Sequence, residues 1–172
     1  LGANDGTTAA PPHGSRAPRQ SFNTTVAVVC VRPSARSRVG DRVTVVGAGM
    51  VGCCVARLLS RFPAVQVTLV DVDAGRADVA AALGVDFALP ADAADGRDLV
   101  VHTSATSAGL QRSLDLLAPE GTVIDLSWYG DSEVQLSLGG AFHSGRLGIR
   151  ASQVGTLSPA RSVTPRRSTS AR

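Results

Sequence analysis

The feature that most constrains the fold of this 172-residue chain is a glycine-rich turn between a predicted strand and a predicted helix. The turn follows a continuous apolar run, Arg42–Val46, and leads into 50–60, where apolar residues recur at helical spacing. Glycines in the order G-x-G-x-x-G permit a tight turn, close approach of a ligand to the backbone, and close packing of the helix on the sheet. The residues expected to form this turn are Gly47, Gly49, Met50, Val51 and Gly52. The free N–H groups and positive dipole end of the helix would then face phosphate groups.

Predicted strands and helices alternate from this turn onward. The predicted strands are 42–46, 66–70, 86–89, 98–103, 122–126, 134–138 and 147–152, and the predicted helices are 50–60, 74–83, 107–117 and 139–144. Pro119 and Gly121 are expected to close the third helix. Strands that are apolar on both faces and separated by helices indicate a parallel sheet covered by helices on both sides. With right-handed crossovers this is an α/β fold with a doubly wound parallel sheet, the Rossmann-type NAD(P)-binding domain.

An acidic residue at the end of the second predicted strand favours one dinucleotide over another. Asp71 lies 19 residues after Gly52, where a carboxylate accepts hydrogen bonds from the hydroxyls of the adenosine ribose. A carboxylate there also repels a 2′-phosphate, so NAD is expected rather than NADP. Arg76 complicates this expectation, because it could lie over the adenine, pair with Asp71 or Asp73, or tolerate a phosphate.

Charge is unevenly distributed along the chain. All 17 basic residues are arginines, and residues 41–150 hold eight of them against thirteen acidic residues, a net charge of −5. Residues 1–40 and 151–172 each carry +4. A phosphate-binding domain that contacts nucleic acid should itself be basic, so no nucleic-acid partner is expected. No apolar run reaches the roughly 18 to 20 residues of a membrane span, so no membrane partner is expected either.

Composition divides the chain into three segments. Residues 1–39 are rich in Ser, Thr, Pro and Gly and are expected to be a disordered or poorly ordered arm, with room for one short strand at 25–31. Residues 40–155 form the predicted dinucleotide-binding domain, and 156–172 are expected to be a disordered tail. Three cysteines, two of them adjacent, do not make a disulfide framework, so a reducing, cytoplasmic location is expected.

Four stretches of this chain resemble the cofactor domain of the medium-chain dehydrogenase/reductase superfamily, which includes the zinc-binding alcohol and sorbitol dehydrogenases. The resemblance covers roughly residues 40–157 and combines the glycine turn, an acid followed by an arginine, and an APEG turn. The stretches are GDRVTVVGAGMVG (40–52), VTLVDVDAGRADVAAALGVD (67–86), DLVVHTSATSAGLQRSLDLLAPEGTVIDLSWYG (98–130) and FHSGRLGIRASQVG (142–155).

The resemblance implies an NAD(P)-dependent oxidoreductase that binds the dinucleotide for hydride transfer to or from an alcohol or carbonyl substrate. In that family the ends of the fourth and fifth strands border the nicotinamide, which would place Thr103 and Ser104 beside it. The family's separate catalytic domain is not recognisable here, so the chain is expected to be a truncated or frame-shifted fragment, catalytically incomplete by itself. No zinc is expected on this chain, because its cysteines and histidines are scattered or adjacent. Members often pair edge strands, which implies a homodimer through 147–152.

Several alternatives stay open beside this reading. The same glycine turn would serve a non-catalytic nucleotide-sensing module, and a Gly-rich turn followed by an acid can also hold S-adenosylmethionine in a methyltransferase, although the third glycine argues against the latter. His102 could reach the cofactor face or be a packed, hydrogen-bonded histidine. Trp128 and Tyr129 could wall the nicotinamide pocket or close the core. A catalytic triad could also be imagined from Ser127, Asp131 and His143, but the turn that usually carries a nucleophilic serine does not precede Ser127.

Overall fold

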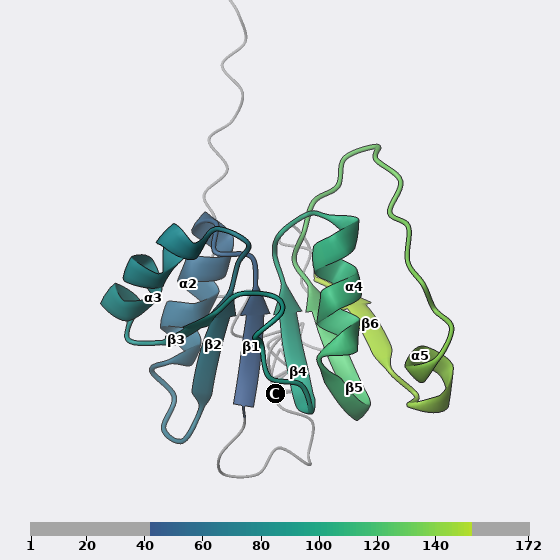
Figure 1. The fold of residues 1–172 in the computed structure, drawn as a ribbon, viewed down its shortest axis with the longest axis horizontal. Coiled ribbons are helices and arrows are strands. Elements are labelled where there is room, and N and C mark those ends of the chain that lie inside the picture. Colours follow the sequence, from purple (N-terminus) through teal and green to yellow (C-terminus); the bar gives the residue numbers. More distant parts are fainter. Residues whose placement is uncertain (1–41, 153–172) are drawn as a thin grey trace, which may run out of the picture.

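The computed structural model describes residues 42–152, which form a six-stranded, all-parallel sheet with helices on both faces (Figure 1). The strands are β1 (Arg42–Val46), β2 (Gln66–Val70), β3 (Asp86–Ala88), β4 (Arg97–His102), β5 (Leu117–Asp125) and β6 (Gly148–Ala151). The helical elements are α2 (Met50–Leu59), the 3₁₀ turn η1 (Ala74–Arg76), α3 (Ala77–Leu83), α4 (Ser107–Asp115) and α5 (Ala141–Ser144). The predicted α/β class and parallel sheet are therefore confirmed. The predictions for 1–39, for a strand at 25–31 and for 156–172 lie outside the described residues.

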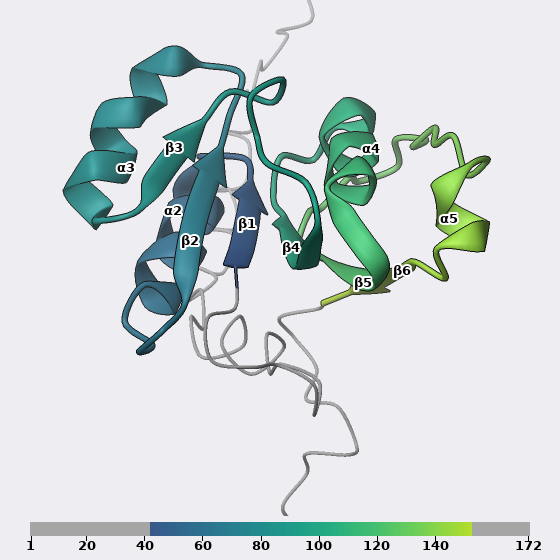
Figure 2. The ribbon, with the colours of Figure 1, turned by 60° about the horizontal axis from the view of Figure 1, so that its bottom comes forward.

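Two apolar cores hold the helices against the sheet. On one face, Val45 and Leu69 are fully buried and pack with Ala56 of α2 and Ala80 of α3. On the other face, buried residues of β1, β4 and β5 pack with α4, around the fully buried Leu116. Both faces of the central strands are thus covered, which explains why these strands are apolar at successive positions. Figure 2 shows the helices and the sheet from a second direction.

The strand order is β3-β2-β1-β4-β5-β6, so the chain reverses its direction of winding after β3. β1 pairs with β2 on one side and with β4 on the other. We call the edge of the sheet at which the parallel strands end the carboxyl edge. At this edge, the connections that leave β1 and β4 run in opposite directions. Ligands of open α/β sheets bind in the crevice at this type of switch point.

The structure corrects the predicted boundary between the third helix and the next strand. α4 ends at Asp115, and β5 begins at Leu117 and includes both Pro119 and Gly121. The backbone N–H of Arg97 donates to the Leu116 carbonyl, and Arg97 aligns with Leu117 across the sheet. An irregular register between the two strands then accommodates the proline before regular pairing resumes.

The predicted strand at 134–138 is wrong. This segment is irregular, although Val134 and Leu136 are half-buried against the α4 core. Its backbone N–H groups bond to side chains of α4: Gln135 donates to Ser107 Oγ at 3.3 Å, and Ser137 donates to Gln111 Oε1 at 2.8 Å. The alternating apolar pattern therefore reflects packing on a helix and not pairing with a strand. The predicted helix 74–83 is also modified, since its first turn is the separate 3₁₀ element η1.

Within residues 42–152, no helix is long and apolar enough to cross a bilayer.

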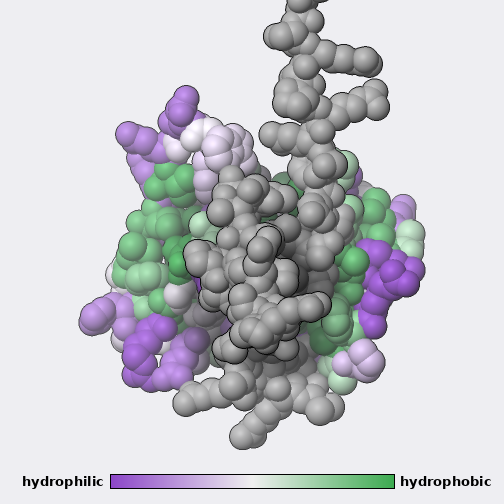
Figure 3. Space-filling model, turned by 180° about the vertical axis from the view of Figure 1, so that it is seen from behind, coloured by the Kyte–Doolittle hydropathy of each residue, from purple (hydrophilic) through white to green (hydrophobic). Residues whose placement is uncertain are grey.

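The sheet ends at β6, whose Ile149 remains 38% exposed. Figure 3 shows hydrophobic residues gathered along its left side, which corresponds to the side of Figure 1 that carries β6 and α5.

Candidate functional site

Two of the three glycines in the turn are required by packing. Gly47 has φ +106°, and a Cβ there would lie 2.8 Å from both the Ser104 backbone nitrogen and Thr103 Oγ1. A Cβ on Gly52 would lie 1.8 Å from the Gly47 carbonyl oxygen and 2.7 Å from Thr103 Oγ1. These glycines let the first turn of α2 and the end of β4 meet without steric overlap.

Gly49 has the opposite environment, because no atom of residues 42–152 lies within 4 Å of the position that its Cβ would occupy. It is the N-cap residue of α2, with an extended backbone, and no side chain caps the helix. The first turn also holds no acidic residue, and Met50 is 69% exposed beside it. The first N–H groups of an α-helix have no intrahelical partners, so a helix start without a side-chain cap and with space at Gly49 suits a phosphate group.

Asp71 is held in place by the same turn. Its Oδ2 accepts a hydrogen bond from the backbone N–H of Ala48 at 2.6 Å, and its Oδ1 accepts one from the N–H of Asp73 at 3.0 Å. Each carboxylate oxygen has a second lone pair, so the group can still accept hydrogen bonds from ligand hydroxyls. Arg76 pairs with Asp73 at 3.4 Å, one of the three arrangements considered from the sequence.

Thr103 and Ser104 follow β4 at the carboxyl edge, beside the glycine turn. The Thr103 hydroxyl donates its one hydrogen to two carbonyl oxygens, which share it. Its Oγ1 lies 2.8 Å from the oxygen of Gly47 and 3.0 Å from that of Val46. Thr103 thus joins the end of β4 to the turn. The predicted contact of Thr103 and Ser104 with a nicotinamide stays a prediction.

The carboxyl ends of β4 and β5 form a polar cluster that sequence reasoning missed. His102 is fully buried, and its Nδ1 lies 3.0 Å from Asp125 Oδ1, because the two residues are aligned across neighbouring strands. Asp125 Oδ1 also accepts the backbone N–H of Ser127 at 3.0 Å, and Oδ2 accepts the Tyr129 hydroxyl at 3.0 Å. On its other side, His102 Nε2 lies 2.8 Å from Ser104 Oγ.

These contacts determine the charges within the cluster. Burial raises the pKa of the Asp125 carboxyl, but the hydrogen bonds from His102 and Ser127 outweigh that effect and hold it below its ordinary value. Burial and the neighbouring Asp125 carboxylate raise the pKa of Tyr129 to about 12, so this phenol stays protonated at neutral pH and donates a hydrogen bond to Asp125. The cluster at neutral pH therefore contains one ionised carboxylate that accepts hydrogen bonds from its neighbours.

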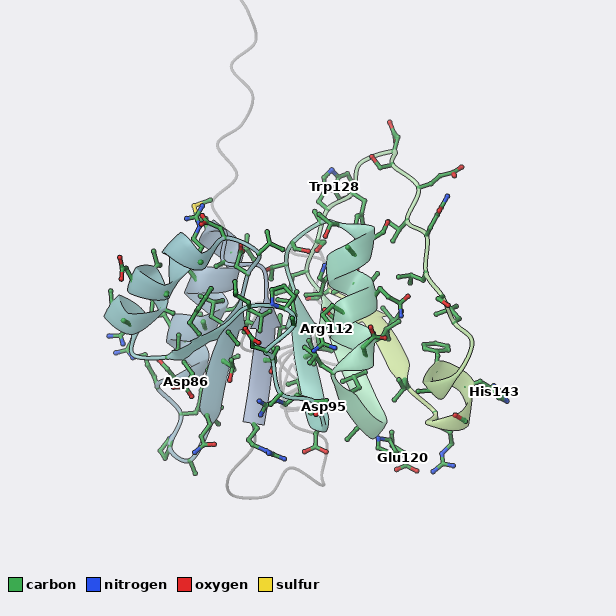
Figure 4. The ribbon with its side chains drawn as sticks, in the orientation of Figure 1. Asp86, Asp95, Arg112, Glu120, Trp128 and His143 are labelled. Carbon is green, nitrogen blue, oxygen red and sulfur yellow. The ribbon has the colours of Figure 1, made fainter. Side chains whose placement is uncertain are left out.

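The structure answers the questions left open about the aromatic pair. Trp128 is 83% exposed at the carboxyl edge (Figure 4), so it does not close the core. Tyr129 is half-buried, and it packs against the α4 core. Ser127 Oγ lies 3.1 Å from His102 Nδ1, whereas Figure 4 shows His143 far from this edge, on α5. The triad of Ser127, Asp131 and His143 therefore does not form.

Zinc does not fit the described part of the chain. Among residues 42–152, no group of three or more His, Cys, Asp or Glu side chains lies close enough to share a metal ion. Cys53 directs its thiol to the Ala48 carbonyl oxygen, and Cys54 is exposed. Structural and catalytic zinc sites need three or four protein ligands.

No protein-family model matches the chain. D-guloside 3-dehydrogenase of Escherichia coli K12 is 37% identical over 101 residues, which are 52% of this chain and 29% of that enzyme. The chain thus matches less than a third of the length of this curated relative.

Solved structures share the fold at low sequence identity. An alcohol dehydrogenase (rspB) of E. coli CFT073, solved with NADH, has a TM-score of 0.63 and 15% identity, and the match covers 76% of this chain and 40% of that one. A zinc-binding dehydrogenase of Sinorhizobium meliloti 1021, solved with bound NADP, has a TM-score of 0.64 and 18% identity, and the match covers 76% of this chain and 41% of that one. The fold and the curated relative together confirm the resemblance to the medium-chain dehydrogenase/reductase superfamily over part of the chain.

Proposed function

We propose that this chain binds a nicotinamide dinucleotide at the carboxyl edge and serves as the cofactor domain of an alcohol or polyol dehydrogenase. The observation that carries the proposal is the open space at Gly49, combined with an uncapped start of α2. Gly47 and Gly52 are packed, while Gly49 faces outward, which is the distribution that a pyrophosphate on the turn requires. The helix start would hold the pyrophosphate through backbone N–H groups, so no basic patch is needed.

The first nucleotide would lie over β1 and β2. Asp71 already has both oxygens oriented by backbone N–H groups, which prepares it to accept the hydroxyls of the adenosine ribose. The same negative charge would repel a 2′-phosphate, and Arg76 is paired with Asp73, which supports NAD over NADP. The second nucleotide would lie over β4 and β5, beside Thr103 and Ser104.

When bound, the nicotinamide supplies the hydride acceptor or donor, and the protein contributes binding, orientation and electrostatics. The substrate would be an alcohol or a carbonyl compound. A sugar-type alcohol is favoured, because the curated relative is named for a guloside. Groups that contact this substrate would come largely from a catalytic domain outside the described residues, so the described domain alone is expected to bind the dinucleotide without turnover.

Calorimetry with NAD, NADP and S-adenosylmethionine tests the proposal and its rivals. NAD should bind most tightly, and Asp71→Ala should weaken its binding by about 1–3 kcal/mol, the cost of losing hydrogen bonds to a charged group. Asp78→Ala is the matched control, because Asp78 is an exposed acid on α3 in the same half of the sheet. Unchanged NAD affinity in Asp71→Ala would remove the ribose assignment, and binding of S-adenosylmethionine alone would favour the methyltransferase.

A second assay separates an enzyme from a nucleotide sensor. Reduction of NAD in the presence of sugar alcohols, by this chain alone or after the catalytic domain of a related dehydrogenase is supplied, would support the dehydrogenase. Tight binding without turnover in both mixtures would support the sensing module. We also propose that β6, the last strand of the sheet, pairs with a second copy, since its Ile149 is 38% exposed. Sedimentation of wild type and Ile149→Lys would test this, with a monomeric wild type excluding it.

A further inference from the structure

The polar cluster at the ends of β4 and β5 contains a continuous hydrogen-bonded path from a buried histidine to the surface. His102 Nε2 lies 2.8 Å from Ser104 Oγ, and Ser104 Oγ lies 3.0 Å from Thr106 Oγ1. His102 is fully buried, whereas Thr106 is exposed. The path therefore connects the imidazole with solvent through two hydroxyl groups.

The hydrogens along this path can be assigned from the groups at its ends. The ionised Asp125 can only accept hydrogen bonds, so His102 Nδ1 carries a hydrogen. Nε2 of the neutral imidazole is then an acceptor, and the Ser104 hydroxyl donates to it. Thr106 Oγ1 accepts the backbone N–H of Gly109 at 3.0 Å, which leaves its own hydrogen to donate to Ser104 Oγ. Every hydroxyl in the path thus points toward His102.

A glycine of α4 makes this close arrangement sterically feasible. A Cβ on Gly109 would lie 2.0 Å from Ser104 Oγ and 3.0 Å from His102 Nε2. The first turn of α4 can therefore lie directly on the path.

We propose that Thr106, Ser104 and His102 form a proton-transfer path through which the His102–Asp125 pair gains one proton when a reduced nicotinamide replaces an oxidised one. The inference rests on the proposed dinucleotide site, whose second half lies over the strands that carry this pair. A proton from solvent would bind Thr106 Oγ1, the Thr106 hydrogen would move to Ser104, and the Ser104 hydrogen would move to His102 Nε2. Each oxygen gains one hydrogen and loses one, so the net transfer is a single proton.

Electrostatics gives the direction of the coupling. An oxidised nicotinamide ring carries a positive charge and a reduced ring is neutral. With His102 neutral, the pair carries the −1 of Asp125 and attracts the oxidised ring, whereas a protonated His102 cancels that charge. Oxidation of an alcohol by the dinucleotide also releases one proton from the hydroxyl to solvent, and uptake of one solvent proton by the pair would offset that release.

Polar and ionisable groups face His102 from several neighbouring elements. β5 and the segment after it contribute Asp125, Ser127 and Tyr129, the segment after β4 contributes Ser104, and α4 contributes Gly109. Val46 of β1 lies alongside in the sheet. Asp125 has a depressed pKa and Tyr129 a raised one, so neither changes charge near neutral pH. Histidine is the side chain whose charge commonly changes in that range.

The test compares the dissociation constants of NAD⁺ and NADH between about pH 5.5 and 8, the range in which histidine titrates. The ratio of the NAD⁺ constant to the NADH constant should rise as the pH falls, by about fivefold or more. His102→Gln should abolish this dependence, and His143→Gln, at an exposed histidine of α5, should retain it. A ratio that stays constant in the wild type would overturn the inference while leaving dinucleotide binding intact. No binding of either dinucleotide would refute the proposed function and this inference together.

Two further measurements keep the inference testable if His102→Gln does not fold. The chain has three histidines, so the imidazole resonance of His102 can be followed by NMR in the wild type. NADH should shift its titration to higher pH than NAD⁺ does, and identical titrations would overturn the coupling. Ser104→Ala should make proton uptake lag behind NADH binding in stopped-flow mixing with a pH indicator. Simultaneous uptake and binding in this variant would exclude the path through Ser104.

Discussion

The two glycines Gly49 and Gly52 should respond to the same substitution in opposite ways. In Gly52→Ala the new methyl carbon would lie 1.8 Å from the Gly47 carbonyl oxygen. The oxygen belongs to the backbone and the methyl carbon is bonded directly to it, so neither can rotate away. The turn and α2 must then separate, which costs about 3 kcal/mol, the upper part of the usual overpacking range. For a domain of this size the melting temperature should fall by about 10 °C.

Gly49→Ala should leave the fold nearly unchanged. Gly49 has φ −74° and ψ −176°, an extended conformation open to any residue, and within the described part of the chain no atom lies within 4 Å of the added Cβ. An alanine N-cap in place of glycine should cost about 0.5 kcal/mol. Its methyl group would nevertheless occupy the space proposed for the pyrophosphate, so NADH should bind about tenfold more weakly, a loss of about 1.4 kcal/mol.

Thermal unfolding followed by circular dichroism, together with NADH titration, measures both effects on the same samples. The expected pattern is a folded but weakly binding Gly49→Ala protein and a destabilised Gly52→Ala protein. The reasoning would be refuted by a Gly52→Ala protein as stable as the wild type. Wild-type NADH affinity in Gly49→Ala would refute the role of the open space.

Three other predictions concern stability. Thr44→Val should stabilise the domain by about 1 kcal/mol in urea unfolding, because the Thr44 hydroxyl is fully buried and has no hydrogen-bond partner among residues 42–152. Thr68→Val, at a half-exposed neighbour on β2, is the control, and an equal gain there would contradict the explanation. Tyr129→Phe should cost about 1.5 kcal/mol, because it removes a hydrogen bond to the charged Asp125, and an unchanged unfolding midpoint would argue against that bond. The pKa of Asp125 is lowered in the folded state, so its contribution to stability is present above the unfolded-state pKa and lost as the pH falls through the folded-state pKa. Asp125→Asn should therefore show a shallower loss of stability with acid than the wild type, and parallel pH curves would contradict this.

The sheet was predictable because its strands are covered on both faces and its first turn has a distinctive chemistry. A central strand such as β1 must be apolar at successive positions, and glycines must follow it where a helix begins at once. Asp71 could be placed because the end of the second strand is fixed relative to the turn. These features depend on residues close together in the sequence.

The failures came from contacts between distant segments. Val134 and Leu136 alternate with polar residues as a strand would, but the α4 side chains satisfy the intervening backbone. The His102–Asp125 pair spans 23 residues, and it requires the register of β4 on β5. One signal was present in the sequence: each residue ends an apolar run, and the ends of neighbouring parallel strands meet at one edge. Aligning those ends would have suggested the pair.

The most direct test of the dinucleotide site is energy transfer from Trp128 to bound NADH. Trp128 is the only tryptophan in the chain, and it is exposed at the carboxyl edge where the second nucleotide is proposed to lie. Excitation of the tryptophan should give saturable NADH emission at one dinucleotide per chain, and NAD should displace it. Tryptophan emission that is unchanged by NADH, with no heat of binding in calorimetry, would contradict the account.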